Sequence, residues 1–295
     1  MLELRSPDGR ARAVILPEHG GRLHQLFVTV DGREEPLLWS PEDVTEYGER
    51  PTRGGSFPMA PWPNRIREGR FTWEGQEYRL PTDEKPHATH GRVLQRVWEV
   101  SSSNERSAEL RCEFDDGWPW EGWAEQRFAL GDGELRMELS VHSSGDRFPA
   151  GAGWHPWFKR DVAGSETTRL RVDADERYVL VDNLPTGEVV RVAGDFDLRS
   201  EPELGDRRLD DCYRGLWRPV ELEWERVGLR MVVDCPWPHV QVFTPDYAVA
   251  VEPQTCVADA FNLADRGVAG VGLQVAAPGR PVRIASTWRW EERRT

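Results

Sequence analysis

The feature that most constrains this chain is the recurrence of short apolar segments joined by tight turns. Residues 23–30 are rich in β-branched and apolar side chains, Asp31 and Gly32 interrupt them, and residues 36–39 resume the pattern. An Asp-Gly pair between two such runs is a strong signal for a β-hairpin. We therefore expect antiparallel strand pairs as the basic unit of this fold.

The same pattern continues along the chain. Further strand pairs are expected at residues 70–73 with 76–80, 98–102 with 108–114, 124–130 with 134–142, 178–181 with 188–192, 221–225 with 229–233 and 240–244 with 248–252. The fourth of these pairs flanks a turn predicted at residues 185–187, and a last pair flanks Pro278-Gly279. No stretch keeps a 3.6-residue apolar period over three turns. The sequence therefore predicts an all-β fold of packed antiparallel sheets, in a single domain over residues 1–295.

Charge and composition exclude several classes of partner. The formal net charge of −13 disfavours binding to nucleic acid or to an anionic membrane. The sequence has no run of about 18 apolar residues, and its first residues lack the apolar segment of a signal peptide. We therefore expect a cytoplasmic protein with no membrane partner. Its four cysteines are far apart and are expected to be reduced thiols: Cys112, Cys212, Cys235 and Cys256.

Five polar residues stand in unusual local contexts. His155 lies in the aromatic segment 153–158, His90 ends a loop, and Glu252 ends an apolar strand. Arg65 follows Asn64 in a proline-rich loop, and Asp210 begins a short acidic pair. Each has an ordinary reading when taken alone. His155 could be a packed core histidine, and His90, like His87, a solvated turn histidine. The other three could be a charge at a strand edge, a surface arginine and a loop acid, in the order Glu252, Arg65 and Asp210.

The motifs that carry these residues resemble, in order, those of the galactose mutarotase (aldose 1-epimerase) family. They are GGSFPMAPWPNRI at 54–66 followed by GRF at 69–71, HG at 90–91, GWHPWF at 153–158, DDCY at 210–213, and EPQT at 252–255 followed by DAFN at 259–262. The similarity extends from residue 16 to residue 279. Trp157 and Tyr213 depart from it, since the family more often has Tyr and Phe there.

This resemblance implies an antiparallel β-supersandwich of the galactose mutarotase type and a cofactor-independent aldose 1-epimerase. Such an enzyme interconverts the α and β anomers of a free aldohexose. Glu252 matches the family's general base and His155 its general acid. The substrate-binding residues would be Arg65, His90, Asp210, Asn64 and Trp157. No metal or cofactor is implied, the partner is a small sugar, and the protein would be a monomer or a homodimer.

Ring opening explains why an acid and a base are needed. The C1 hydroxyl must lose a proton while the ring oxygen gains one, and two positioned groups do both at once. Unperturbed carboxyl and imidazole groups would give a bell-shaped rate profile with limbs near about pH 4–5 and 6–8.

The sequence leaves four alternative functions open. A hexose-6-phosphate mutarotase would hold the phosphate with Arg67, Arg92 or Arg96, although an acidic chain favours a neutral sugar. A non-catalytic sugar-binding protein would need no acid–base pair. A facial-triad metal site would use two histidines and a carboxylate, but the chain has no H-x-H or H-E-x-x-H motif. A glycosidase would use two carboxylates, Glu252 and Asp210, and no histidine. The roles of Trp118, Trp120 and Trp123 are undetermined.

Overall fold

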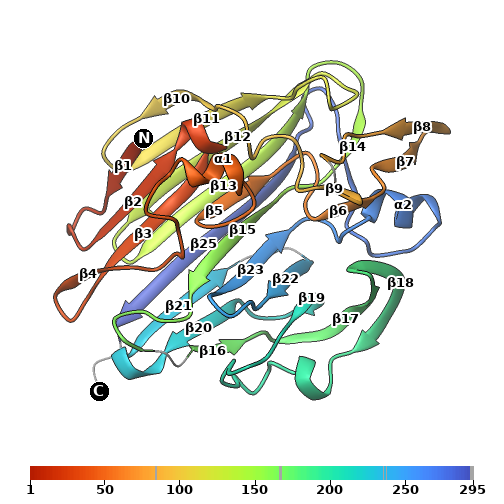
Figure 1. Ribbon diagram of the computed structural model, residues 1–295. Helices are drawn as coiled ribbons and strands as arrows, with labels where there is room; N and C mark the ends of the chain where they lie inside the picture. The colour runs from red at the N-terminus through yellow and green to blue at the C-terminus, as the bar shows by residue number, and fades with distance from the viewer. Residues whose placement is uncertain (84, 166–167, 235, 237, 293–295) are drawn as a thin grey trace.

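A computed structural model describes residues 1–83, 85–165, 168–234, 236 and 238–292 (Figure 1). Nearly all of its regular structure is β-strand, and the neighbouring strands of both large sheets run antiparallel. Strand β12 (Gly122–Gly131) shows the cause, because its side chains alternate between buried and more exposed positions. A strand with this alternation has one face in the core and one toward solvent. The prediction of an all-β fold is confirmed.

The larger sheet has eleven strands in the order β1-β2-β3-β5-β15-β23-β22-β19-β17-β18, with β4 paired to β3. Their bounds are β1 Leu2–Arg5, β2 Ala11–Leu16, β3 Arg22–Val30, β4 Arg33–Pro36, β5 Ser56–Met59, β15 Gly153–Lys159, β17 Ala174–Val181, β18 Leu184–Arg191, β19 Asp210–Leu216, β22 His239–Phe243 and β23 Ala248–Gln254.

The second sheet has eight strands in the order β10-β11-β12-β13-β25-β21-β20-β16. Besides β12, these are β10 Glu99–Ser103, β11 Ser107–Glu113, β13 Glu134–Ser143, β16 Thr168–Arg171, β20 Val220–Trp224, β21 Leu229–Asp234 and β25 Val282–Glu292.

Three two-stranded ribbons, two short α-helices and three single-turn 3-10 helices (Pro17–His19, Gly194–Phe196 and Glu225–Val227) complete the described fold. The ribbons are β6 (Arg65–Arg67) with β9 (His87–Thr89), β7 (Arg70–Trp73) with β8 (Gln76–Arg79), and β14 (Phe148–Ala150) with β24 (Gln274–Ala276). The α-helices are α1 (Glu46–Glu49) and α2 (Ala260–Asp265). Figure 1 shows the first two ribbons and α2 grouped at one side of the larger sheet. No helix among the described residues is long and apolar enough to cross a membrane.

The main core lies between the two large sheets. Phe158 on β15 contacts Trp288 on β25, with ring centroids 4.9 Å apart. Trp154 on β15 donates its indole N–H to Gln126 on β12 at 3.0 Å. Because alternate side chains of a strand point to opposite faces, His155 and Trp157 lie on the face of β15 away from this core. That face carries a second apolar cluster of its own, which includes Phe57, Met59, Leu94, Trp157 and Ala248.

Three details of the expected strand pairs are wrong. The first hairpin resumes at Arg33, not at residue 36, because Asp31 and Gly32 both take positive φ and form a two-residue turn. The predicted turn at residues 185–187 lies inside β18, and Asp182 and Asn183 make the turn instead, with φ of 51° and 59°. Proline is tolerated there because β18 is an edge strand. In the last pair, β24 pairs with β14 and not with β25.

The unassigned tryptophans pack against other rings. Trp118 lies 5.5 Å from Trp62 and 5.2 Å from Trp120, between ring centroids. Trp123 stacks on His142 at 4.8 Å. Trp118 thus packs against the loop that contains Trp62, Trp120 packs against Trp118, and Trp123 covers a strand on the second sheet.

The cysteines also lie in packed surroundings. Cys112, Cys212 and Cys256 are buried free thiols. Cys235 lies outside the described residues.

Candidate functional site

A cavity of about 690 Å³ opens on the face of the larger sheet that points away from the main core. We call it the His155 cavity. All seven residues predicted for the site line it: Asn64, Arg65, His90, His155, Trp157, Asp210 and Glu252. They come from four strands and two loop ends that are far apart in the sequence, and the fold brings them together.

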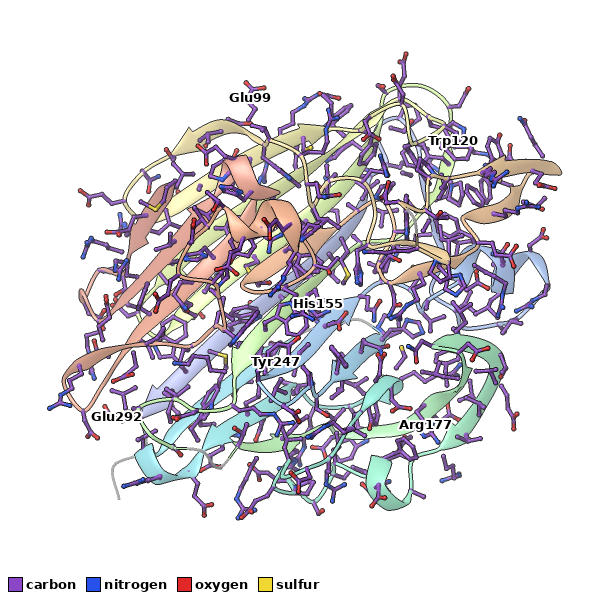
Figure 2. All side chains as sticks on the ribbon, in the orientation of Figure 1. Glu99, Trp120, His155, Arg177, Tyr247 and Glu292 are labelled. Atoms are coloured by element: carbon purple, nitrogen blue, oxygen red, sulfur yellow. The ribbon has the colours of Figure 1, made fainter. Side chains whose placement is uncertain are left out.

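The centre of the cavity is a contact between His155 and Glu252. Strands β15 and β23 pair so that Gly153 faces Gln254 and Trp157 faces Ala250, which sets His155 opposite Glu252. The Nε2 atom of His155 lies 3.2 Å from Oε1 of Glu252. The two side chains are only 7% and 3% exposed. Figure 2 shows His155 near the middle of the molecule, above the strands of the larger sheet.

Burial shifts the proton affinities of this pair toward the uncharged forms. It raises the pKa of Glu252 well above its usual value, and the negative charge of Asp210 adds to the rise, while Arg65 opposes it. Burial also lowers the pKa of His155 to about 3. Both shifts favour states in which the pair carries no net charge, because a low dielectric penalises a net charge.

A third buried titratable group lies beside the pair. Burial lowers the pKa of His90, and the neighbouring His155 lowers it further. The His90 and His155 rings meet edge to face at 5.4 Å. His90 is therefore a neutral imidazole that can both donate and accept hydrogen bonds.

Aromatic rings fix the orientation of His155. Its ring lies nearly parallel to those of Phe57 and Trp157, with centroids 4.9 and 4.7 Å away. Trp157 in turn stacks on Tyr247 at 5.7 Å. Tyr247 and Phe243 also line the cavity, so one of its walls is aromatic. Aromatic faces of this kind can cover the apolar side of a sugar ring.

The ribbon β6–β9 carries the polar groups of the opposite wall. Arg65 pairs with Thr89 across the ribbon, and the backbone N–H of His90 donates to the carbonyl of Asn64 at 2.7 Å. Arg65 Nη1 donates to Asn64 Oδ1 at 3.0 Å. Asn64 and His90 both take left-handed backbone conformations, with φ of 54° and 60°. Such strain at non-glycine residues is held only where surrounding contacts over-determine the backbone.

The acidic pair on β19 divides between two roles. Asp210 lines the cavity, and its Oδ1 accepts a 2.6 Å hydrogen bond from Gln241 Nε2. Gln241 sits opposite Glu252 in the register of β22 and β23. Asp211 points to the other face and pairs with Arg177 at 3.1 Å. The alternation of the strand thus gives one carboxylate to the cavity and the other to an ion pair.

Several lining residues were not anticipated from the sequence. Tyr247 lies in the turn that connects β22 to β23, five positions before Glu252. This closeness to Glu252 in the expected hairpin was the sequence signal that could have placed Tyr247 at the site. Lys85, one of two lysines, stands at the rim. His87, which the sequence places in a solvated turn, is half-buried on β9, lines the cavity and accepts a hydrogen bond from the Glu68 N–H at 3.2 Å.

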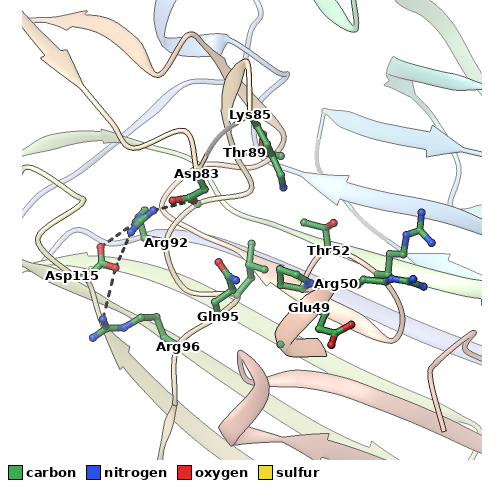
Figure 3. A pocket seen from close by; sticks show the side chains of 15 residues that line it. Glu49, Arg50, Thr52, Asp83, Lys85, Thr89, Arg92, Gln95, Arg96 and Asp115 are labelled. Carbon is green, nitrogen blue, oxygen red and sulfur yellow. Dashed lines mark hydrogen bonds and ion pairs between the residues drawn. The ribbon is translucent and has the colours of Figure 1, made fainter. Parts of the chain in front are cut away.

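A second cavity of about 570 Å³ adjoins the first and shares four lining residues with it: Thr52, Arg53, Lys85 and Thr89. Figure 3 shows that Arg92 lies between two carboxylates there. Its Nε and Nη2 atoms each donate to Asp115 at 3.0 Å, and Nη1 lies 3.5 Å from Asp83. Arg96 lies 3.7 Å from the same Asp115. The positive charges of these two arginines are therefore already balanced by carboxylates.

Within the part of the chain that the structure describes, no three His, Cys, Asp or Glu side chains are grouped so that they could hold a metal ion.

Comparison with known proteins places the chain in a family. The sequence profile described as aldose 1-epimerase matches residues 3–271. The chain belongs to the aldose 1-epimerase family. It is 25% identical over 242 residues to the uncharacterised protein YihR of Escherichia coli (strain K12), a match that covers 77% of this chain and 76% of that one. It is also 33% identical over 153 residues to the galactose mutarotase of Rattus norvegicus, covering 48% of this chain and 44% of that protein.

Solved structures share the fold. A putative aldose 1-epimerase from Escherichia coli K12 superimposes with a TM-score of 0.84 at 22% identity, covering 99% of this chain and 98% of that one. An aldose epimerase homologue from C. elegans gives a TM-score of 0.86 at 19% identity, covering 99% of both chains. The fold is therefore of the galactose mutarotase type, as expected from the sequence.

Proposed function

We propose that this protein is an aldose 1-epimerase that interconverts the α and β anomers of a free aldohexose by acid–base ring opening and reclosure. The observation that carries the proposal is the buried contact of 3.2 Å between His155 and Glu252 at the centre of a polar cavity. Membership of the aldose 1-epimerase family supports the same chemistry.

In this proposal Glu252 takes the proton of the C1 hydroxyl while His155 gives one to the ring oxygen. The bond between C1 and the ring oxygen then breaks, and C1 becomes a carbonyl carbon. Rotation about the C1–C2 bond presents the other face of the carbonyl, and the two groups exchange roles as the ring closes. Each positioned proton transfer of this kind contributes about 10²–10⁴-fold to the rate.

The proton count of the buried pair fits this scheme. Opening needs one proton on the two groups together, so that one can give while the other takes. Burial favours the same count, because it raises the pKa of Glu252 and lowers that of His155. The uncharged pair and the ion pair differ only by one proton moved along the 3.2 Å contact. Arg65 opposes the rise in the pKa of Glu252 and so favours the carboxylate that acts as base.

The remaining polar residues would hold the sugar. Arg65, His90 and Asp210 present hydrogen-bonding groups that can fix its hydroxyls, with Asn64 beside Arg65. Trp157 offers a ring face next to the acid. Holding the open chain in place matters because a freely rotating aldehyde could turn away from both groups before it closes.

Polarimetry tests this proposal directly. The optical rotation of freshly dissolved α-glucose and α-galactose should relax to equilibrium faster with the purified protein than without it. A rate that does not rise with protein concentration for either sugar would refute the proposed function and leave a hexose-6-phosphate mutarotase or a non-catalytic sugar-binding protein.

A further inference from the structure

We propose that Asp259, which lies outside the His155 cavity, is a positioning residue that fixes Arg65 for sugar binding. This inference rests on the proposed function of the cavity. Asp259 stands immediately before α2, seven residues after Glu252. Its contacts link the strand that carries the base to the ribbon that carries Arg65.

Asp259 holds both ends of strand β6. Its backbone N–H donates to the carbonyl of Arg65 at 2.6 Å. Its Oδ1 atom accepts a hydrogen bond from the backbone N–H of Arg67 at 2.9 Å. The same Oδ1 accepts from Asn262 Nδ2 at 2.7 Å, and Asn262 Nδ2 also donates to the carbonyl of Arg70 at 2.8 Å. Three backbone groups of residues 65–70 are therefore held by one short segment.

The carboxylate of Asp259 is enclosed by the protein. The side chain of Asp259 is 0% exposed, and its Oδ2 atom lies 3.7 Å from Arg67 Nε. The residue also takes the left-handed conformation, with φ of 56°. A buried charge and a strained backbone are both unfavourable unless hydrogen bonds compensate for them. Here the backbone N–H and Oδ1 of Asp259 bond to β6, while Oδ2 has no hydrogen-bond partner and only the 3.7 Å ion pair with Arg67.

The path from Asp259 back to the base is rigid. Residues 255–260 are all buried. Thr255 donates its backbone N–H to Ala152 at 2.8 Å and accepts from the Ala152 N–H through Oγ1 at 2.9 Å. Ala152 in turn lies three residues before His155. The acid, the base and Asp259 are therefore connected through ordered backbone, and Asp259 sets the place of Arg65 relative to both.

This arrangement predicts an effect on substrate binding that depends on Arg65. Arg65 would bind sugar hydroxyls in the ground state and the transition state alike, so loosening it should raise KM more than it lowers kcat. Asp259→Gly removes the carboxylate without adding backbone strain, because glycine accepts a positive φ. We expect KM to rise about tenfold and kcat to change by less than about threefold.

A double-mutant cycle separates positioning from general destabilisation. In an Arg65→Ala background, Asp259→Gly should change kcat/KM by less than about twofold, because the group it positions is gone. Equal losses in both backgrounds would overturn the proposal. Asp265→Ala is the matched control, since this exposed acid ends the same helix, and it should leave kcat and KM unchanged.

A conservative variant keeps the test decisive if the glycine variant does not fold. Asp259→Asn can retain the acceptor for Arg67 N–H and loses only the ion pair. It should raise KM about two- to threefold in the wild-type background and not in the Arg65→Ala background. The same rise in both backgrounds would again overturn the proposal.

Hydrogen exchange gives a readout that does not depend on activity. In Asp259→Gly the amide of Arg67 should exchange faster, while amides of β13 should exchange as in the wild type. Unchanged exchange at Arg67 would refute the positioning role. If the wild-type protein does not anomerise glucose or galactose, the proposed function fails, and this measurement still decides whether Asp259 orders the ribbon.

Discussion

Replacing Glu252 by glutamine tests the proposed base with little change in shape. The residue is buried, so the variant must keep the same volume to avoid a cavity or a clash. Glutamine does so, but it cannot take a proton from the C1 hydroxyl. Its amide can still lie against His155, whose Nε2 atom is 3.2 Å from the present Oε1.

The expected loss of activity follows from the burial of this site. Removing a general base costs about 10²–10⁴-fold, which is about 2.7–5.4 kcal/mol of transition-state stabilisation at 1.36 kcal/mol per tenfold. Because Glu252 is enclosed, bulk water has little access to act in its place. We therefore expect kcat to fall toward the larger end of this range, by about 10³-fold or more.

The same substitution should stabilise the fold at neutral and higher pH. The folded-state pKa of Glu252 is raised above its unfolded value, so its favourable contribution is complete below about pH 4.5 and is lost as the pH rises through the folded pKa. Glutamine does not titrate. The melting temperature of Glu252→Gln relative to the wild type should therefore increase from pH 4 to pH 8.

Polarimetry with α-glucose and thermal melts at the two pH values measure both effects. Glu99→Gln on the exposed strand β10 is the control and should alter neither. A folded Glu252→Gln variant with kcat within tenfold of the wild type would refute the assignment of the base. A relative melting temperature that falls with pH would refute the sign of the pKa shift.

Further expectations concern the acid, pH, metals and substrate. His155→Asn should lower kcat by roughly 10²-fold or more while the protein stays folded, and near wild-type turnover would contradict its role. The pH–rate bell should be wider than unperturbed groups would give. Its acid limb should lie near pH 3, where the pair gains a second proton on His155, and its alkaline limb at the raised pKa of Glu252. Limbs near pH 4.5 and 6.5 would count against a pair that shares one proton. Exhaustive chelation should leave the rate unchanged, because side chains fill both proton-transfer roles, and loss of activity that one added metal restores would favour a metal site. Glucose should have a kcat/KM at least as high as that of glucose 6-phosphate, because Arg92 is already paired with Asp115 and Arg67 with the buried Asp259. A kcat/KM at least tenfold higher for glucose 6-phosphate would overturn the proposal of a free sugar as substrate.

The class of fold was predictable because its signals are local. Asp-Gly turns and alternating apolar residues depend on neighbours within a few positions, and most expected strands appear with small shifts of their ends. The shifts occur where local signals compete. Pro185 looked like part of a turn, but Asp182 and Asn183 took the positive φ values that a two-residue turn needs.

The residues of the candidate site were also found from the sequence, because several motifs follow one another in the order typical of the family. No single residue would have been enough. All seven lie in one cavity, but their roles stay predictions until they are tested. Gln241 was not found, and the motif at 259–262 gave Asp259 no role, because the hydrogen-bond partners of both residues lie on strands distant in sequence. Tyr247 was not found because only the β22–β23 hairpin carries it to the rim.

By itself, the sequence determined the strand-rich fold, the order of the motifs and the chemical groups available for acid–base work. Only the tertiary structure decided that β15 pairs with β23 in the register that sets His155 opposite Glu252. It also decided how these two groups hold protons, because their pKa shifts arise from burial by residues remote in the chain. Register and burial depend on long-range packing between segments, and a local pattern of residues does not specify either.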